Sequence, residues 1–371
     1  MLKFMIWKEF LQLKRDKKMF GIIFMAPVIQ LIVLGYAANF DVERISTAVC
    51  DYDRSNESAQ YLDRYFSGGY FERTVNLNKS GDIDKLLEKG EIQAAIVIPS
   101  GFGRNIAKGT QTDVQLIING SDTNYATNAF NYAAQITARF STKILLEKMA
   151  MAGMNSIPQV KLEQRLLYNP ELKTKNFMVP AIMGLILMII TVMLTSMAIV
   201  REKEMGTIEQ LIVTPIKKGP VLAGKLIPFL IIGLIDVALV TAVAIFLFRI
   251  PFKGSFFLLF CGAILFLFNT LGLGLFVSTV SATQQQAMMT VLFVIMMPFI
   301  YLSGFVFPVE NMPLFFQYIS EVIPLTHFLI IVRGLFLKGS NFADLAPHLA
   351  AMLTTGIIIF AISMKRFRKY I

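Results

Sequence analysis

Cysteine, histidine, tryptophan and charged residues are all scarce in this chain. Among its 371 residues are two cysteines, two histidines and one tryptophan, and only 16% are charged. Cys50 lies in a polar stretch and Cys261 in a long apolar one, which excludes a disulfide framework. His327 and His348 are not accompanied by a Cys or carboxylate cluster at metal-ligand spacing. We therefore expect neither a metal site nor a catalytic cluster.

The chain also lacks a complete phosphate-binding loop. That motif requires Gly-x-x-x-x-Gly-Lys followed by Ser or Thr, between a strand and a helix. The best match, GPVLAGKL (Gly219–Leu226), ends in leucine where a magnesium-binding hydroxyl is required, and it opens an apolar helix. We therefore expect no nucleotide site, no bound cofactor and no enzyme activity in this chain.

Long apolar runs are what the chain has in excess. It is 55% hydrophobic, against about 45–50% for soluble domains. About 20 apolar residues of helix cross a hydrocarbon core, and buried helices of soluble proteins rarely exceed that length. The predicted spans are 19–38, 176–200, 226–248, 254–280, 287–307 and 345–364. The expected fold is an α-helical polytopic membrane protein with six transmembrane helices.

The distribution of Lys and Arg predicts how these spans are oriented. Fifteen basic residues lie in segments 1–18, 201–225 and 365–371, whereas four lie in the short loops on the opposite side. The first three segments, with both termini, are therefore expected in the cytoplasm. The net charge of +10 is then a topology signal and requires no nucleic-acid partner. Residues 1–18 are too polar for a cleavable signal peptide, so 19–38 is predicted to be a signal anchor.

A polar insert, 39–175, interrupts the apolar segments. It contains 16 basic and 16 acidic residues and no run long enough to span, and the predicted topology places it outside the cytoplasm. Its alternation of strands and helices predicts a small α/β domain with both sheet faces covered. The expected strands are ISTAVCDYD, FERTVNL, IQAAIVIPSGF and VQLIINGSD; the expected helices are SNESAQYLDRYF with its Ser55 cap, GDIDKLLEKG, and about Thr123 to Met151.

Residues 308–344 are apolar enough to suggest a seventh span, but polar residues and a proline interrupt them. The interruptions are Glu321, Pro324, His327 and Arg333. A seventh crossing would also place the basic tail 365–371 outside, against the charge bias. We predict two short helices that enter the outer leaflet or lie on it.

The segment REKEMGTIEQLIVTP (Arg201–Pro215) places charged residues and a proline between the second and third spans. Thr207 and Gln210 fit a capping box, Pro215 ends the helix, and Gly206 permits a bend before it. Between them lies a short apolar stripe of Ile208, Leu211, Ile212 and Val213. We expect a short capped helix along the cytoplasmic membrane surface. By spacing alone, an ordinary interfacial loop helix fits equally well.

The N-terminal segment 1–18 has the composition of a helix that lies in the headgroup plane. Six basic residues accompany an apolar series at helical spacing, Leu2, Ile6, Phe10 and Leu13. Trp7 is its expected interfacial anchor. The alternative is a simple positive flank of the first span.

Three motifs carry a family resemblance. REKEMGTIEQLIVTPIKKGPVLAGKLIPF (201–229), YLSGFVFPVENMP (301–313) and RGLFLKG (333–339) resemble the permease subunits of ATP-binding cassette exporters of the second permease type. The resemblance covers nearly the whole chain, including the large extracytoplasmic domain between spans one and two. It implies that the segment between spans two and three docks in a groove of a separate ATPase subunit. The positions that match this docking motif are Glu202, Glu204, Gly206, Thr207, Glu209, Gln210 and Thr214.

The resemblance also implies partners, a location and a substrate class. ATP and magnesium would bind the partner ATPase, and a second permease subunit, identical or related, would complete the path. Relatives of this kind export drugs, lipids or ions, some with a periplasmic adaptor protein. We therefore expect a lipophilic or amphipathic substrate and location in the bacterial inner membrane. The alternative is a membrane sensor or adhesion protein whose outer domain binds a ligand and signals through the cytoplasmic helix.

Two polar residues within the predicted spans are candidates for the translocation path. Asp236 is the only acidic residue inside a predicted span, and Asn269 lies in the fourth. Ionisable residues at such depth are costly and usually face a cavity or a partner helix. A protonated or hydrogen-bonded packing contact is the alternative for Asp236, and close helix packing is the alternative for Asn269.

Overall fold

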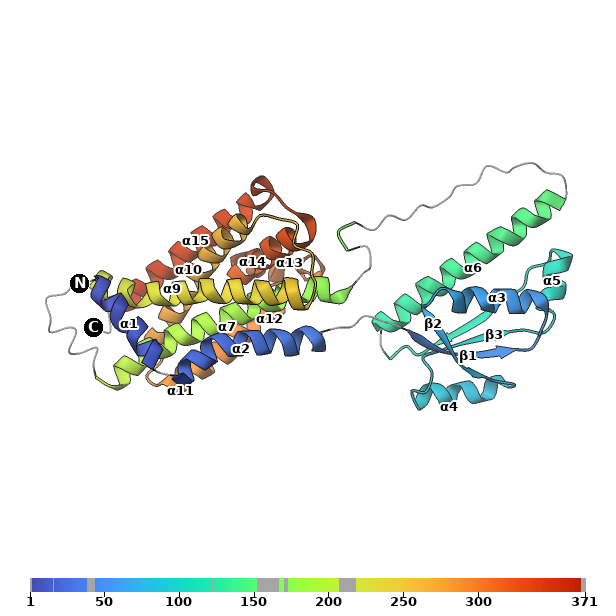
Figure 1. Ribbon diagram of the computed structural model, residues 1–371, viewed down its shortest axis with the longest axis horizontal. Helices are drawn as coiled ribbons and strands as arrows, with labels where there is room; N and C mark the ends of the chain where they lie inside the picture. The colour runs from blue at the N-terminus through green and yellow to red at the C-terminus, as the bar shows by residue number, and fades with distance from the viewer. Residues whose placement is uncertain are drawn as a thin grey trace. The chain divides into compact units, whose positions relative to one another are not determined.

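The chain folds into two compact units (Figure 1). The first combines Met1–Asn39 with Arg165–Ile371, and the second is Phe40–Gln164. The computed structural model describes residues 2–15, 17–38, 44–121, 123–151, 167–169, 173–206 and 218–367.

The first unit is built from helices. They are α1 (Leu2–Arg15), α2 (Lys17–Ala37), α7 (Thr174–Glu204), α9 (Lys218–Ala242), α10 (Phe256–Val280), α11 (Gln284–Met289), α12 (Met297–Leu302), α13 (Leu314–Val322), α14 (Pro324–Arg333) and α15 (Phe342–Phe367). Short π-helical segments continue α9, join α11 to α12 and follow α14.

Five helical stretches of the described residues are long and apolar enough to cross a membrane. They are Thr174–Glu204, Leu222–Leu247, Phe256–Val280, Gln284–Leu302 and Phe342–Phe367. Each overlaps one of the predicted spans, in agreement with a polytopic membrane protein. For the predicted first span, the apolar stretch found within α2 is the shorter Ile23–Ala37.

Helix α13 and the stretch Pro324–Lys338 form a pair bent by 84°. The bend has a local cause. Ile323, which precedes the proline, is extended with φ −81° and ψ 116°, because a residue before proline disfavours the helical region. Such a pair is either a broken span or a re-entrant loop, so the described residues of this unit contain five candidate spans, or six if the pair crosses.

Helix α10 packs against both α7 and α15 and forms the middle of the first unit. A Cβ at Gly274 would lie 2.6 Å from Thr195 Cβ and 2.9 Å from the Val192 carbonyl oxygen, so only glycine permits this approach of α10 to α7. Phe266 of α10 stacks on Phe328 of α14 with ring centroids 4.1 Å apart. The interior is therefore close-packed around α10.

The second unit contains a four-stranded sheet in the order β2–β1–β3–β4. Its elements are β1 (Ile45–Asp51), α3 (Asn56–Ser67), β2 (Phe71–Asn76), α4 (Ile83–Glu88), β3 (Ala94–Ile98), α5 (Phe102–Lys108), β4 (Gln115–Ile118) and α6 (Thr123–Met151). Strand β1 is parallel to β2 and β3, whereas β4 is antiparallel to β3.

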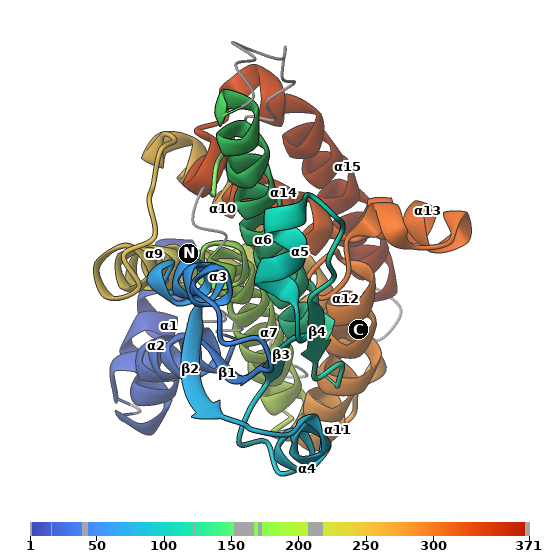
Figure 2. The ribbon, with the colours of Figure 1, turned by 90° about the vertical axis from the view of Figure 1, so that its right-hand side faces the viewer.

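Alternate residues of the central strands serve the two faces of this sheet. Val49 and Ile96 pack with α3 and α6, while Cys50 and Val97 pack with α4. Figure 2 shows α4 on the opposite side of the sheet from α3 and α6. Both faces are covered, as predicted, and Ser55 caps α3 by accepting a hydrogen bond from the Ser58 amide.

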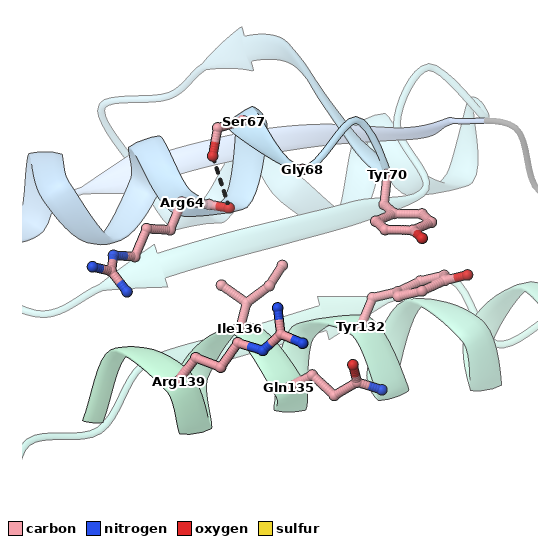
Figure 3. A pocket seen from close by; sticks show the side chains of 8 residues that line it. All are labelled: Arg64, Ser67, Gly68, Tyr70, Tyr132, Gln135, Ile136 and Arg139. Carbon is pink, nitrogen blue, oxygen red and sulfur yellow. Dashed lines mark hydrogen bonds between the residues drawn. The ribbon is translucent and has the colours of Figure 1, made fainter. Parts of the chain in front are cut away.

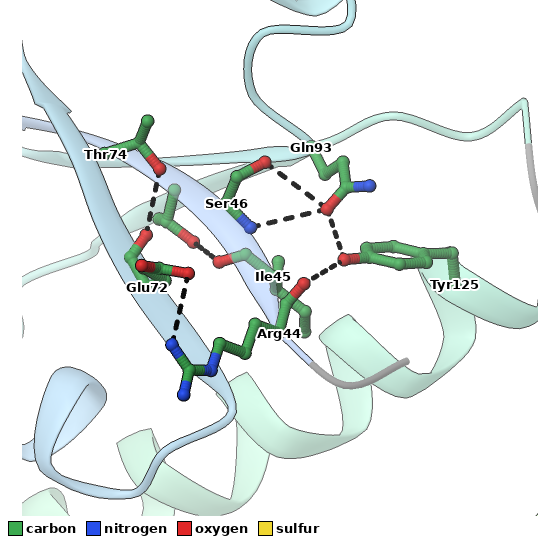
Figure 4. Close-up of polar contacts among 8 residues, drawn as sticks. Arg44, Ile45, Ser46, Glu72, Thr74, Gln93 and Tyr125 are labelled. Carbon is green, nitrogen blue, oxygen red and sulfur yellow. Dashed lines mark hydrogen bonds and ion pairs between the residues drawn. The ribbon is translucent and has the colours of Figure 1, made fainter. Parts of the chain in front are cut away.

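Gln93 connects the first turn of α6 to the start of strand β1 (Figure 4). Its side-chain oxygen accepts hydrogen bonds from the amide and hydroxyl of Ser46, each at 3.3 Å, and from the Tyr125 hydroxyl. The Tyr125 hydroxyl also contacts the Arg44 carbonyl oxygen at 2.6 Å. The Gln93 side chain, just before β3, thus connects strand β1 to helix α6.

The predicted strand IQAAIVIPSGF is too long, because β3 ends at Ile98 and a helix not predicted, α5, begins at Phe102. Pro99 has no amide hydrogen with which to continue a strand. Gly101 then turns the chain with φ +84°, a conformation that favours glycine. The carboxylate of Asp53 accepts hydrogen bonds from the amides of Gly101 at 2.7 Å and Gly103 at 2.8 Å.

These contacts give the second unit a predictable acid sensitivity. The Ser55 hydroxyl and the Gly103 and Gly101 amides hold the pKa of Asp53 below its ordinary value of 3.8. A lowered folded-state pKa contributes stability above the unfolded value, and this is lost as pH falls through the folded value. We expect Asp53→Asn to lower the melting temperature at pH 7, with a smaller difference at pH 3. Thermal unfolding of the full chain at both pH values tests this, and an equal difference at both would contradict it.

Candidate coupling site at the bases of helices α7 and α9

Four charged side chains meet where α7 ends and α9 begins. Lys225 of α9 contacts Glu202 of α7 and lies 3.6 Å from Glu9 of α1. The Lys8 Nζ atom lies 3.5 Å from Glu202 Oε1 and 3.6 Å from Glu9 Oε1. Two cations and two anions therefore form four ion pairs with one another, and we call these four residues the ion-pair cluster. It joins α1 to the helices on either side of the predicted docking segment.

Burial makes this cluster different from an ordinary surface ion pair. Glu9, Glu202 and Lys225 are 8%, 9% and 6% exposed, whereas Lys8 is exposed. Surface pairs contribute about 0–1 kcal/mol, but removing one partner of a buried pair costs about 3–5 kcal/mol because a charge is left unpaired. The cluster is therefore a strong constraint on the relative positions of its three helices.

Apolar packing surrounds the same end of the unit. Ile199 of α7, Leu222 of α9 and Leu275 of α10 form a buried cluster. Met364 and Phe367, at the end of α15, pack against it. The bases of four helices are thus held together beside the ion-pair cluster.

Glu204, another predicted docking residue, contacts a different neighbour from Glu202. Its carboxylate accepts hydrogen bonds from the amide of Gln284, at 2.9 Å, and from the Gln284 side chain. It thereby satisfies a free amide at the start of α11, where a negative charge is favourable. Lys203 donates to the Ser281 carbonyl oxygen at 3.2 Å. The end of α7 is therefore tied to the α10–α11 turn as well.

Gly206 ends α7 in the left-handed conformation, with φ +67°. A Cβ at this position would meet no atom of the described residues within 4 Å, so among them only the backbone angle restricts the residue. Left-handed geometry costs other residues about 1–2 kcal/mol. The predicted bend at Gly206 thus takes the form of a helix-terminating glycine.

The remaining predicted docking residues, Thr207, Glu209, Gln210 and Thr214, lie outside the described residues. The structure describes the chain up to Gly206 and again from Lys218, the first residue of α9. Within α1, Trp7 is 63% exposed and Phe4 is 78% exposed. These rings leave an apolar surface on α1 that suits the predicted interfacial position of Trp7.

Comparison with known proteins identifies the family. Residues 17–365 match the family described as ABC-2 family transporter protein. The chain belongs to the ABC-2 family of transporter proteins. It is 31% identical over 366 residues to the probable multidrug ABC transporter permease YbhR of Escherichia coli strain K12, with 98% of each chain covered.

Two further relatives from the same strain agree with this assignment. The chain is 27% identical over 363 residues to the probable multidrug ABC transporter permease YbhS, covering 98% of this chain and 95% of that one. It is 28% identical over 370 residues to the inner membrane transport permease YhhJ, covering 98% and 96%. The resemblance to ABC permeases is therefore confirmed, and the chain is a multi-pass ABC-2 transporter permease.

Asp236 lies inside this ABC-2 permease, only 1% exposed. Neither of its carboxylate oxygens has a hydrogen-bond partner among the described residues. Nearby on α9, Thr241 donates to the sulfur of Met183 on α7 at 3.7 Å, and a Cβ at Gly233 would meet Leu267 of α10. An ionised carboxylate in such a place would cost several kcal/mol, so the neutral acid is the expected form.

That expectation separates two substitutions of Asp236. Asp236→Asn preserves the shape and neutrality of the acid and should change the free energy of unfolding by less than about 1 kcal/mol. Asp236→Lys places a longer, charged side chain there and should cost about 3 kcal/mol or more. Thermal melting of the detergent-solubilised permease measures both. Equal losses in the two variants would contradict a neutral Asp236.

Asn269 is fully engaged in joining α10 to α15. Its amide donates to the carbonyl oxygens of Leu265 and Met352, each at 2.8 Å, and its oxygen accepts from Thr355 at 3.0 Å. The side chain is completely buried. These contacts are those of an interhelical polar contact, and a role of Asn269 in the translocation path stays a prediction.

The fold brings together polar residues that sequence spacing left apart. Nδ1 of His327 lies 3.1 Å from Nδ1 of His348, and His327 Nε2 donates to the Glu321 carbonyl oxygen at 2.8 Å. With both rings neutral, His348 is then the donor to His327.

Arg333 is also in contact with residues that are distant in the sequence. Its Cζ atom lies 3.6 Å from the centroid of the Phe177 ring, and its guanidinium group donates to the Gly304 carbonyl oxygen at 3.0 Å. Among the described residues, no three His, Cys, Asp or Glu side chains gather into a metal site.

Proposed function

We propose that this permease is the membrane subunit of an ATP-driven exporter, powered by a separate ATPase subunit that docks on the segment after Gly206. One observation carries the proposal. The ion-pair cluster fixes the bases of α7 and α9 to each other and to α1, while Gly206 ends α7 beside it. Because the ends of α7 and α9 are held together, a displacement of the segment between them is transmitted to both helices. A flexible connection would not transmit it.

The two kinds of glutamate contact suggest how displacement would spread through the permease. Glu202 connects the base of α7 to α1 and α9, while Glu204 connects it to the start of α11. Movement of the docking segment would therefore reach four helices through charged contacts. Thr207, Glu209, Gln210 and Thr214 are the proposed contacts with the ATPase, which would bind ATP and magnesium.

The proposed assembly contains two permease subunits and two ATPases in the bacterial inner membrane. The positive-inside rule favours cytoplasmic termini and an extracytoplasmic second unit. The stretch Gln284–Leu302 is largely unburied, and its exposed Phe293 and Val294 would contact lipid or the second permease. The names of the YbhR and YbhS relatives refer to multidrug transport, which supports a lipophilic or amphipathic substrate. A periplasmic adaptor is a further proposed partner.

Affinity purification of the full chain from its native membrane tests this function. Digitonin-solubilised permease should retain an ATPase subunit in near-stoichiometric amount, and the isolated complex should hydrolyse ATP. A tagged permease that lacks residues 207–217 should lose the ATPase yet remain in the membrane fraction. Recovery of the native permease without any ATPase would instead favour the sensor alternative.

A further inference from the structure

The second unit carries a pocket between the C-terminal end of α3 and the middle of α6 (Figure 3). Its volume is about 280 Å³. It is lined by Arg64, Ser67, Gly68, Tyr70, Tyr132, Gln135, Ile136 and Arg139. The pocket thus combines two guanidinium groups, two phenol rings, one amide and one aliphatic side chain.

Neither guanidinium group of this pocket is neutralised by a carboxylate of the described residues. No Asp or Glu oxygen of that part of the chain lies within 4.0 Å of Arg64 or Arg139. Lys143, one turn beyond Arg139 on α6, does have such a partner, because it lies 3.4 Å from Glu147. The pocket therefore offers two cationic groups that remain available to an anion.

The surrounding sequence reinforces this positive character. Helix α6 contains no Asp or Glu before Glu147, so Arg139 has no acidic neighbour on the preceding turns of its own helix. The Arg64 guanidinium is held over the Phe140 ring, 5.6 Å from its centroid. Arginine presents a planar set of donors that matches a carboxylate, sulfonate or phosphate group.

The two tyrosines close one end of the pocket. Tyr70 and Tyr132 stack with centroids 3.8 Å apart and an interplanar angle of 19°, and Figure 3 shows them facing each other from the two sides of the gap. Burial, with a smaller effect of Tyr70, raises the pKa of Tyr132. Its hydroxyl therefore stays protonated and does not repel an anion, while Ile136 supplies an apolar contact.

Size restricts what such a pocket can hold. Sites for drug-sized ligands usually enclose about 300–1,000 Å³, and this pocket lies just below that range. We propose that it binds a small organic anion with a flat ring: the acidic group lies between Arg64 and Arg139, and the ring lies against Tyr70, Tyr132 and Ile136. This site is independent of the proposed coupling to an ATPase.

Equilibrium dialysis with naphthalene-2-sulfonate tests the proposal on the full chain in phosphatidylcholine nanodiscs, with empty nanodiscs subtracted. The double variant Arg64→Gln/Arg139→Gln should weaken binding at least about tenfold, because charge-assisted hydrogen bonds are lost. Lys143→Gln, the matched control on the same helix, should stay within about twofold of the native protein because its ion pair lies on the surface. Naphthalene-2-methanol, the neutral analogue, should bind much more weakly than the sulfonate.

Three results would overturn the site. They are native affinity in the double variant, an equal loss in Lys143→Gln, and equal binding of the neutral analogue. A circular dichroism spectrum of each variant shows whether the chain keeps its native secondary structure. Tyr132→Leu supplies an independent variant that should weaken sulfonate binding while preserving both arginines. A hexaglutamate peptide provides a further comparison. If it displaces bound sulfonate at a lower concentration than free sulfonate does, the small-anion assignment is rejected in favour of a protein partner.

Discussion

Lys225→Glu is expected to destabilise the permease by about 3–5 kcal/mol, because it removes the buried cation of the ion-pair cluster. The variant would place three carboxylates together, Glu9, Glu202 and the new one, beside the exposed Lys8. Most of the protein should then fail to elute as a single folded peak from size-exclusion chromatography in mild detergent.

A charge exchange distinguishes the cluster from a simple packing defect. Glu202→Lys combined with Lys225→Glu restores the contact between residues 202 and 225 with its charges exchanged, and restores the net charge of the cluster, but it places a cation beside Lys8 and an anion beside Glu9. We expect this double variant to recover part of the folded protein and part of the substrate-stimulated ATP hydrolysis, because only one of the lost ion pairs is restored. Lys365→Glu is the matched control, because Lys365 is exposed at the end of α15 and surface changes alter stability by about 0.5 kcal/mol or less. A double variant as unstable as Lys225→Glu alone would contradict the pairing.

Glu209→Lys is expected to uncouple ATP hydrolysis from transport without unfolding the permease. Glu209 lies in the proposed docking segment, and reversing its charge would oppose the contact with the ATPase. Substrate-stimulated hydrolysis in proteoliposomes should fall about tenfold, within the range of typical coupling energies, while basal hydrolysis persists. Gly206→Val should have a similar effect because valine at φ +67° would redirect the start of the segment.

Arg201→Gln provides the control for both substitutions. Arg201 is exposed on the last turn of α7 and lies outside the ion-pair cluster. Its stimulated hydrolysis should stay close to that of the native complex. Unchanged stimulation in both Glu209→Lys and Gly206→Val would argue against the docking assignment.

Local signals in the sequence were sufficient for much of the fold. Apolar length alone indicated five segments in which the described residues form helices long and apolar enough to cross a membrane, and alternation of strands and helices indicated the sheet of the second unit. The long helix expected from about Thr123 to Met151 occupies those residues. Helix caps and proline breaks also depend on neighbouring residues alone. The sequence therefore predicts the helix cap at Ser55 and the break at Pro324.

What the sequence could not supply were contacts between distant segments. The motif predicts that Glu202 is a docking residue, and that stays a prediction. Its spacing gave no sign that the carboxylate lies beside Lys8 and Lys225, which are distant in the sequence. Glu9 is an acid among apolar and basic neighbours, which hints at an ion pair. Its position in the sequence does not indicate that Lys225 is a partner. The meeting of His327 with His348 likewise depends on how α14 packs on α15.

Cross-linking from residue 209 tests the central claim most directly. Cys50 and Cys261 are replaced by alanine, Glu209→Cys is introduced, and a bifunctional maleimide reagent is added to inverted membrane vesicles that contain the native ATPase. The account predicts a covalent product of permease and ATPase from Glu209→Cys, and none from Lys79→Cys on the second unit. Reaction of residue 209 only in right-side-out vesicles, or its failure to reach any ATPase, would contradict the account.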